Sequence, residues 1–89
     1  MIKKLFSIND VKSFFVNITS REYSYVFVKT KKDDKFVFKY KSQCYDLSET
    51  CCYLLNCDTN MIEIVPYIDI EQILYMDSSD TVTCYVVFV

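Results

Sequence analysis

Apolar residues near the N-terminus recur at the spacing of an α-helix. Between residues 8 and 18 they fall on one face, and polar residues fall opposite. The segment opens with Ser7 and carries Asp10 three residues later, like a capping box with Asp in place of Glu. The pattern therefore predicts an amphipathic helix over about residues 8–18 whose apolar stripe packs on a sheet. The predicted stripe consists of Ile8, Val11, Phe14, Phe15 and Ile18.

Beyond the helix, alternating runs predict β-strands separated by polar turns. Residues 23–30 are largely apolar on both faces, which indicates a strand that is central or covered on both sides. Residues 35–41 alternate more cleanly, and the turn at 31–34 joins the two runs into an antiparallel hairpin. Further strands are predicted at 50–56, 61–65, 73–77 and 81–89, with a single helical turn at 68–72. Pro66 ends the strand before it, because proline cannot donate to a sheet ladder.

The last predicted strand is apolar on both faces at its end and lacks the Lys or Pro that protects an exposed sheet edge. We therefore expect it to be covered, and the interior of its own sheet is favoured over a homodimer or a partner. Its expected core face consists of Val82, Cys84, Val86 and Phe88.

These elements predict the α+β class: one N-terminal amphipathic helix packed on a mainly antiparallel sheet of about five to six strands. The hairpin order indicates a meander or a small barrel-like topology, and 89 residues fit a single domain over 1–89. No apolar run reaches the roughly 20 residues of a membrane helix. The polar residues that follow Phe6 argue against a signal peptide, so a cytoplasmic protein is expected.

The composition excludes several kinds of active site. The chain has no glycine, which removes the glycine-dependent phosphate loops and dinucleotide fingerprints. It has no histidine, which removes Ser-His-Asp and Cys-His catalysis and histidine metal ligands. Pairs of carboxylates occur near predicted turns, where Asp is expected for backbone reasons. We therefore expect no enzyme activity, catalytic residue or cofactor.

The five cysteines are expected to be free thiols. Their number is odd, and they are spaced C-x6-C-C-x4-C before a long gap to the last. No CxxC pair is present, which disfavours a zinc site, so we expect no metal. Cys52, Cys57 and Cys84 are interpreted as small buried apolar groups.

Charge is divided sharply along the chain. Residues 1–41 hold all ten basic residues and four acidic ones, a net of +6, whereas residues 42–89 hold eight acids and no base, a net of −8. The lysines of the first hairpin predict a basic patch for nucleic acid: Lys29, Lys31, Lys32, Lys35, Lys39 and Lys41. The acids predict a surface for a basic partner: Asp46, Glu49, Asp58, Glu63, Asp69, Glu71, Asp77 and Asp80. The alternative is that neighbouring strands mix these charges, which then only solvate the surface.

We expect a small non-enzymatic protein-binding module. Its short length, unusual composition and lack of a catalytic constellation are typical of phage or mobile-element inhibitors that occlude a larger host protein, including anti-defence and anti-CRISPR proteins. The partner is then a host protein in the host cytosol, and a host protein that itself binds nucleic acid is one such partner. The alternative function is a small nucleic-acid-binding β-barrel that uses the lysine-rich hairpin at 29–41, with tyrosines stacking on bases. A homo-oligomeric module is a further alternative.

Overall fold

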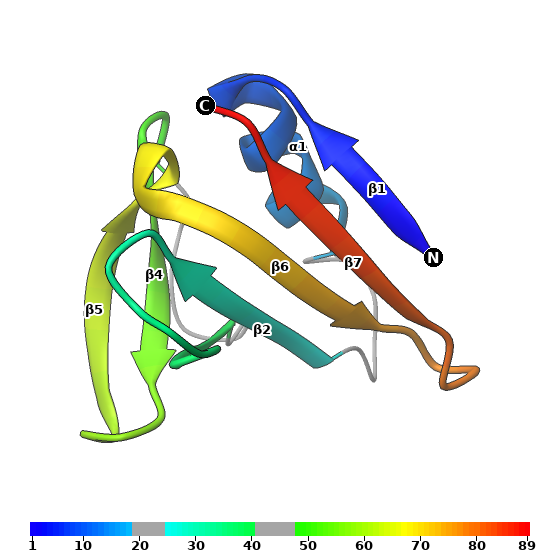
Figure 1. Ribbon diagram of the computed structural model, residues 1–89. Coiled ribbons are helices and arrows are strands. Elements are labelled where there is room, and N and C mark those ends of the chain that lie inside the picture. The colour runs from blue at the N-terminus through cyan, green and yellow to red at the C-terminus, as the bar shows by residue number, and fades with distance from the viewer. Residues whose placement is uncertain (19–24, 41–47) are drawn as a thin grey trace.

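The computed structural model describes residues 1–18, 25–40 and 48–89, and it has the α+β fold that the sequence predicts (Figure 1). Among these residues one α-helix lies on one face of a strongly curled sheet, whose β4–β5 end runs steeply across the direction of β2, β6 and β7. The elements are β1 (Ile2–Leu5), α1 (Ile8–Ile18), β2 (Tyr25–Thr30), β3 (Phe38–Tyr40), β4 (Cys51–Asn56), β5 (Met61–Pro66), the 3₁₀-helix η1 (Tyr67–Asp69), β6 (Ile70–Met76) and β7 (Val82–Val87).

In the described part of the chain the sheet has seven strands, not the five to six that we expected, and their order is β1-β7-β6-β2-β3-β4-β5. The missed strand is β1, which pairs in parallel with β7 and makes the sheet mixed. It carries Lys3 and Lys4 in only four residues, so it has no apolar alternation from which to predict a strand. The remaining pairs are antiparallel, as expected.

Helix α1 confirms the prediction in its bounds, its cap and its stripe. The Asp10 amide donates to Ser7 Oγ at 3.0 Å, and the Phe6 amide donates to Asp10 Oδ2 at 3.1 Å. The Ser7 side chain therefore satisfies one of the amides that a helix start leaves unpaired, and the Asp10 carboxylate binds the amide of the residue that precedes the cap. Four residues of the stripe are buried, and Ile8 lies exposed at the helix start: the buried set is Val11, Phe14, Phe15 and Ile18.

The core under the helix is rich in aromatic rings. Phe15 is completely buried, and its ring lies 5.2 Å from the ring of Tyr40 and 6.2 Å from that of Tyr67. The ring of Phe14 lies 5.9 Å from Tyr75 and 4.7 Å from Tyr85. The two phenylalanines thus join the helix to both halves of the sheet, since Tyr40 is on β3 and Tyr85 is on β7.

Strand β7 lies between β6 and β1, which confirms that the C-terminal strand is interior to its own sheet. The expected core face was wrong, because the opposite set of side chains points toward α1. Thr83 and Val87 are buried and Tyr85 packs against the core, whereas Val82 and Phe88 are about half exposed. Both faces of this strand are apolar, so alternation alone could not identify the side that the helix covers.

The segment between Pro66 and β6 also differs from the prediction. The helical turn is a 3₁₀-turn at Tyr67–Asp69, and β6 begins at Ile70 rather than at residue 73. Strand β3 is shorter than the predicted run at 35–41. Without glycine, Asn60 and Asp80 take the left-handed conformation in the turns, with φ of 59° and 62°.

Candidate functional site

The sheet order mixes the two charged halves of the chain. Strands β2 and β3 come from the basic half, yet they lie between β6 and β4, which both come from the acidic half. Three ion pairs cross this boundary among the described residues. They join Lys12 to Glu49, Lys29 to Glu71 at 3.7 Å, and Lys35 to Asp58 at 3.7 Å. Each is at least partly exposed and contributes little stability, but together they remove the simple division into a basic and an acidic surface.

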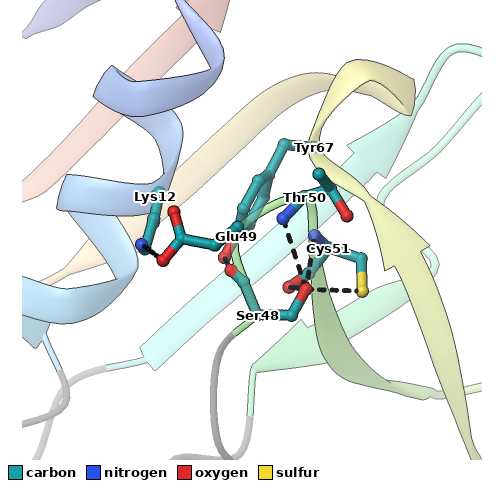
Figure 2. Close-up of polar contacts among 6 residues, drawn as sticks. All are labelled: Lys12, Ser48, Glu49, Thr50, Cys51 and Tyr67. Carbon is teal, nitrogen blue, oxygen red and sulfur yellow. Dashed lines mark hydrogen bonds and ion pairs between the residues drawn. The ribbon is translucent and has the colours of Figure 1, made fainter.

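The acid Glu49 belongs to a polar cluster at the start of β4 (Figure 2). Ser48 Oγ accepts the amides of Cys51 at 3.0 Å and Thr50 at 3.3 Å, and it lies 2.9 Å from Cys51 Sγ. The Tyr67 hydroxyl donates to the Ser48 carbonyl at 2.9 Å. The serine and tyrosine are thus committed to backbone groups, and the chain has no histidine to act as a base. These hydrogen bonds fix the entry of the chain into β4.

The ionisable groups buried beneath this cluster are kept neutral. Burial, followed by the charge of the neighbouring Cys51, raises the pKa of the Cys52 thiol to about 12. Burial is also the main cause that raises the pKa of Tyr67 and of Tyr40, with Cys52 as the second cause. A thiol or phenol held in its protonated form is a poor nucleophile or base at neutral pH. Nor do the described residues gather three or more side chains able to hold a metal ion.

Two of the predicted site acids hold a turn together. In the turn between β6 and β7, Asp77 Oδ1 accepts the amides of Ser79 at 2.9 Å and Thr81 at 3.0 Å. Asp80 takes the left-handed conformation in the same turn. These acids therefore have the backbone role that the sequence analysis assigned to turn carboxylates.

Two other predicted acids, Glu63 and Asp69, come together at a pocket of about 280 Å³. Asp33, which was not among the predicted site residues, joins them, and Lys32 of the predicted basic patch also lines the pocket. The last predicted acid, Asp46, lies outside the described residues. The predicted acids thus have separate local roles, and two of them share one cavity.

The predicted basic patch is likewise divided. Lys29 and Lys35 pair with acids, and Lys31 Nζ donates to the carbonyl of Val89 at 2.8 Å. Lys39 Nζ lies 5.1 Å from the centre of the Tyr25 ring, a cation–π arrangement on the outer face of the sheet. Lys41 lies outside the described residues.

The sequence analysis missed the sheet face that points away from α1. By strand register, one set of side chains points outward from β1, β7, β6 and β2. We call it the open face: Ile2, Tyr25, Phe27, Leu74, Met76, Val82, Cys84 and Val86. Tyr25 and Val82 are each 48 % exposed, and Phe27 and Leu74, in the middle of their strands, are partly exposed. The expectation of a central strand is confirmed for β2 (Tyr25–Thr30), but its outer face is not fully covered.

The signal for the open face was present in the sequence as strands that are apolar on both sides. We interpreted that pattern as burial, since a doubly covered strand and an apolar docking surface have the same alternation. The described residues contain one α-helix, and it lies on the inner face, so the outward side chains keep contact with solvent. That helix is too short to cross a membrane.

No protein-family model matches the chain, and searches of curated proteins and of solved structures found no match either.

Proposed function

We propose that this chain is a small non-enzymatic protein-binding module that docks its open face on a larger host protein and blocks it. Phage and mobile-element inhibitors act in this way in the host cytosol, and anti-defence and anti-CRISPR proteins are the kind we favour. The observation that supports binding is the apolar open face, because a contiguous exposed apolar patch on a small domain is typical of an interaction surface.

The size of the open face fits the centre of an interface. The four strands lie about 4.8 Å apart and average about six residues in length, and with a rise of about 3.3 Å per residue they span roughly 20 by 20 Å. A stable complex buries about 800 Å² on each partner, so the apolar centre supplies about half of that area. The polar rim supplies the rest, and by register it includes Lys4, Lys29 and Lys39. A partner with an apolar patch bordered by acidic groups would complement this face.

The docking proposal is tested with two variants matched in exposure. Val82 on the open face and Val16 on α1 are each 48 % exposed, so a lysine at either position costs the fold little. We expect affinity capture from the source cell, read by mass spectrometry, to recover the same host protein with the wild type and with Val16→Lys. Val82→Lys should lose it, because a charge placed on the apolar open face must be desolvated on binding. Equal capture by all three proteins would refute docking through the open face.

The inhibitory role needs a separate measurement. The chain is expressed in host cells that carry a defence system, including CRISPR–Cas, and the efficiency of phage plating is measured. Protection of the phage by the wild type and by Val16→Lys, with loss in Val82→Lys, is the expected result. Host-protein capture without any effect on plating would keep the binding module but reject the anti-defence role.

The alternative function is nucleic-acid binding, and it is favoured by one observation. The pair of Lys39 and the half-exposed Tyr25 places a cation and an aromatic ring together on the outer face of β2 and β3, which suits base stacking near a phosphate. The ion pairs of Lys29 and Lys35 weaken the electrostatic part of this alternative. Fluorescence anisotropy with single-stranded DNA and RNA tests this alternative. If the lysines bind phosphates, the logarithm of the binding constant should fall linearly with the logarithm of the salt concentration. Absence of binding at low salt would eliminate this alternative.

A further inference from the structure

The sheet has two edges, and they are not equally protected. The β1 edge is four residues long and carries Lys3 and Lys4, which discourage pairing with another strand. The β5 edge is six residues long, and its exposed side chains include Met61 at 65 % and Ile64 at 62 %. Pro66 protects only the end of β5. The β5 edge is therefore the one that is open to strand addition.

The pairing of β5 with β4 decides which backbone groups face this edge. The Tyr67 amide donates to the Thr50 carbonyl at 3.0 Å, so Thr50 and Tyr67 form a hydrogen-bonded pair. In an antiparallel ladder every second residue pair is hydrogen-bonded, so counting from this pair identifies the other bonded residues of β5. By register, Val65 and Glu63 direct their amides and carbonyls toward β4. Ile62 and Ile64 then direct theirs away from β4, which leaves two donors and two acceptors at the edge.

The pocket of about 280 Å³ adjoins this edge. Its lining includes the four consecutive residues 63–66. Successive side chains of a strand point to opposite faces, so a cavity lined by four in a row runs along the strand edge. The rest of the lining includes Thr30 at the end of β2, Asp33 in the turn that follows β2, and Asp69 at the end of η1. The volume is below the roughly 300–1,000 Å³ of small-molecule sites, and it suits a single long side chain.

The charge of the pocket selects that side chain. Its lining has three carboxylates and one lysine: Asp33, Glu63, Asp69 and Lys32. Thr30 Oγ1 donates to Asp33 Oδ2, and Asn56 Nδ2 donates to Glu63 Oε2 at 2.6 Å, so two of the carboxylates are oriented by neighbours. Each keeps a second oxygen, and the Asp69 carboxylate has no partner among the described residues. Planar carboxylates bind a guanidinium group through paired hydrogen bonds better than they bind an ammonium group.

We propose that the β5 edge binds an extended segment of a partner protein by strand addition and that the pocket takes an arginine of that segment. This site is separate from the open face, and it does not depend on the function proposed above. A second copy of β5 is a poorer occupant. The antiparallel register that satisfies both Ile62 and Ile64 places Glu63 opposite Glu63 of the other copy, and like charges in that position are unfavourable.

The test uses a fluorescein-labelled heptapeptide, Thr-Val-Thr-Arg-Thr-Val-Thr, with blocked ends. We expect anisotropy to show binding that weakens about tenfold when citrulline replaces the arginine, because citrulline keeps the shape and removes the charge. Methylation of the amides of the two residues that flank arginine should abolish binding, since these amides face Ile62 and Ile64. In amide hydrogen exchange, Ile62 and Ile64 should gain protection when the arginine peptide is bound.

Variants of the protein separate this site from the rest of the molecule. Glu63→Gln with Asp69→Asn should weaken the arginine peptide about tenfold and leave the citrulline peptide unchanged. Ile64→Pro should abolish binding of both, and circular dichroism checks that it folds. Val82→Lys, on the open face, should bind as the wild type does. Equal affinity for the two peptides, or protection at β1 in place of β5, would overturn the proposal. So would concentration-dependent dimerisation that Ile64→Pro removes, because a second copy would then occupy the edge.

Discussion

The substitution Phe15→Ala tests the central packing of the fold. Phe15 lies in the middle of α1 with no exposed surface, and its ring contacts those of Phe14, Tyr40 and Tyr67 at centroid distances of 5.3, 5.2 and 6.2 Å. The substitution removes this ring from the point where the helix, β3 and η1 meet.

The expected loss of stability follows from three contributions. Complete burial of a phenylalanine side chain contributes about 1.5–3 kcal/mol. Each aromatic pair adds about 0.5–1.5 kcal/mol, and the remaining cavity adds a further penalty because its walls collapse only in part. Large-to-small changes of this kind cost about 3–5 kcal/mol in total. Domains of this size are stable by about 4–13 kcal/mol, so Phe15→Ala should remove a large share of the free energy of unfolding.

Urea unfolding followed by circular dichroism measures the effect. The free energy of unfolding falls with urea concentration by about 1 kcal/mol per molar, at the lower end of the usual range for small proteins. The urea concentration at the midpoint of unfolding should therefore fall by about 3 M or more. Phe15→Leu serves as a graded variant, since it keeps most of the volume and should cost less than Phe15→Ala. Val16→Ala, on the exposed side of the same helix, should change stability by less than about 0.5 kcal/mol. A loss below about 1 kcal/mol for Phe15→Ala would refute the packing of the stripe on the sheet.

Three further predictions concern the buried hydroxyls, the last strand and the thiols. The buried Tyr40 hydroxyl has no hydrogen-bond partner among the described residues, so urea unfolding should show Tyr40→Phe to be neutral or stabilising. Tyr67→Phe removes the hydrogen bond to the Ser48 carbonyl, so it should lower the free energy of unfolding by about 1 kcal/mol. Burial raises the pKa of Tyr67 in the folded state above its unfolded value near 10. The protonated Tyr67 therefore contributes fully to the free energy of unfolding below pH 10, and this contribution should be lost as the pH rises above 10. A free energy of unfolding that stays constant above pH 10 would contradict this. Truncation after Tyr85 removes part of a strand that lies between two others, so circular dichroism should show an unfolded chain, and a folded truncate would contradict the sheet order. The interpretation of Cys57 as buried was wrong, because its side chain is exposed, whereas Cys52 is buried. In native thiol titration Cys57 should therefore react first and Cys52 last, because burial also raises the pKa of the Cys52 thiol to about 12; the reverse order would refute the assigned burial.

Local sequence signals predicted the elements whose partners are close in the chain. The 3.6-residue period and the capping residues around Ser7 predicted α1 with its observed bounds. Alternation and turn residues predicted the hairpins of β4 with β5 and of β6 with β7, since each pair is joined by a short polar turn. The absence of glycine and histidine excluded whole classes of chemistry through composition alone. Each of these inferences depends on residues within a few positions of one another or on the residue types present.

Local sequence patterns could not predict which charged side chains lie next to one another on the surface. The acids and lysines are separated along the sequence, but the positions of β2 and β3 between β6 and β4 bring them into contact. Lys29 and Glu71 are 42 positions apart and form an ion pair through this strand order. No local pattern encodes strand order, so the predicted acidic and basic surfaces could not be tested from the sequence. The pocket that joins Glu63 to Asp69 and Asp33 depends on the same curl of the sheet.

The sequence by itself determined the helix, most of the strands and the residue types available for chemistry, because these follow from local periodicity and composition. Tertiary structure decided the parallel docking of β1 on β7, the side of β7 that is buried, and the existence of an open face. Strands that are apolar on both sides fit either a doubly covered position or one covered face and one docking face. Only the placement of α1 on one side of the sheet distinguishes these two cases, and that placement depends on contacts between residues far apart in the chain.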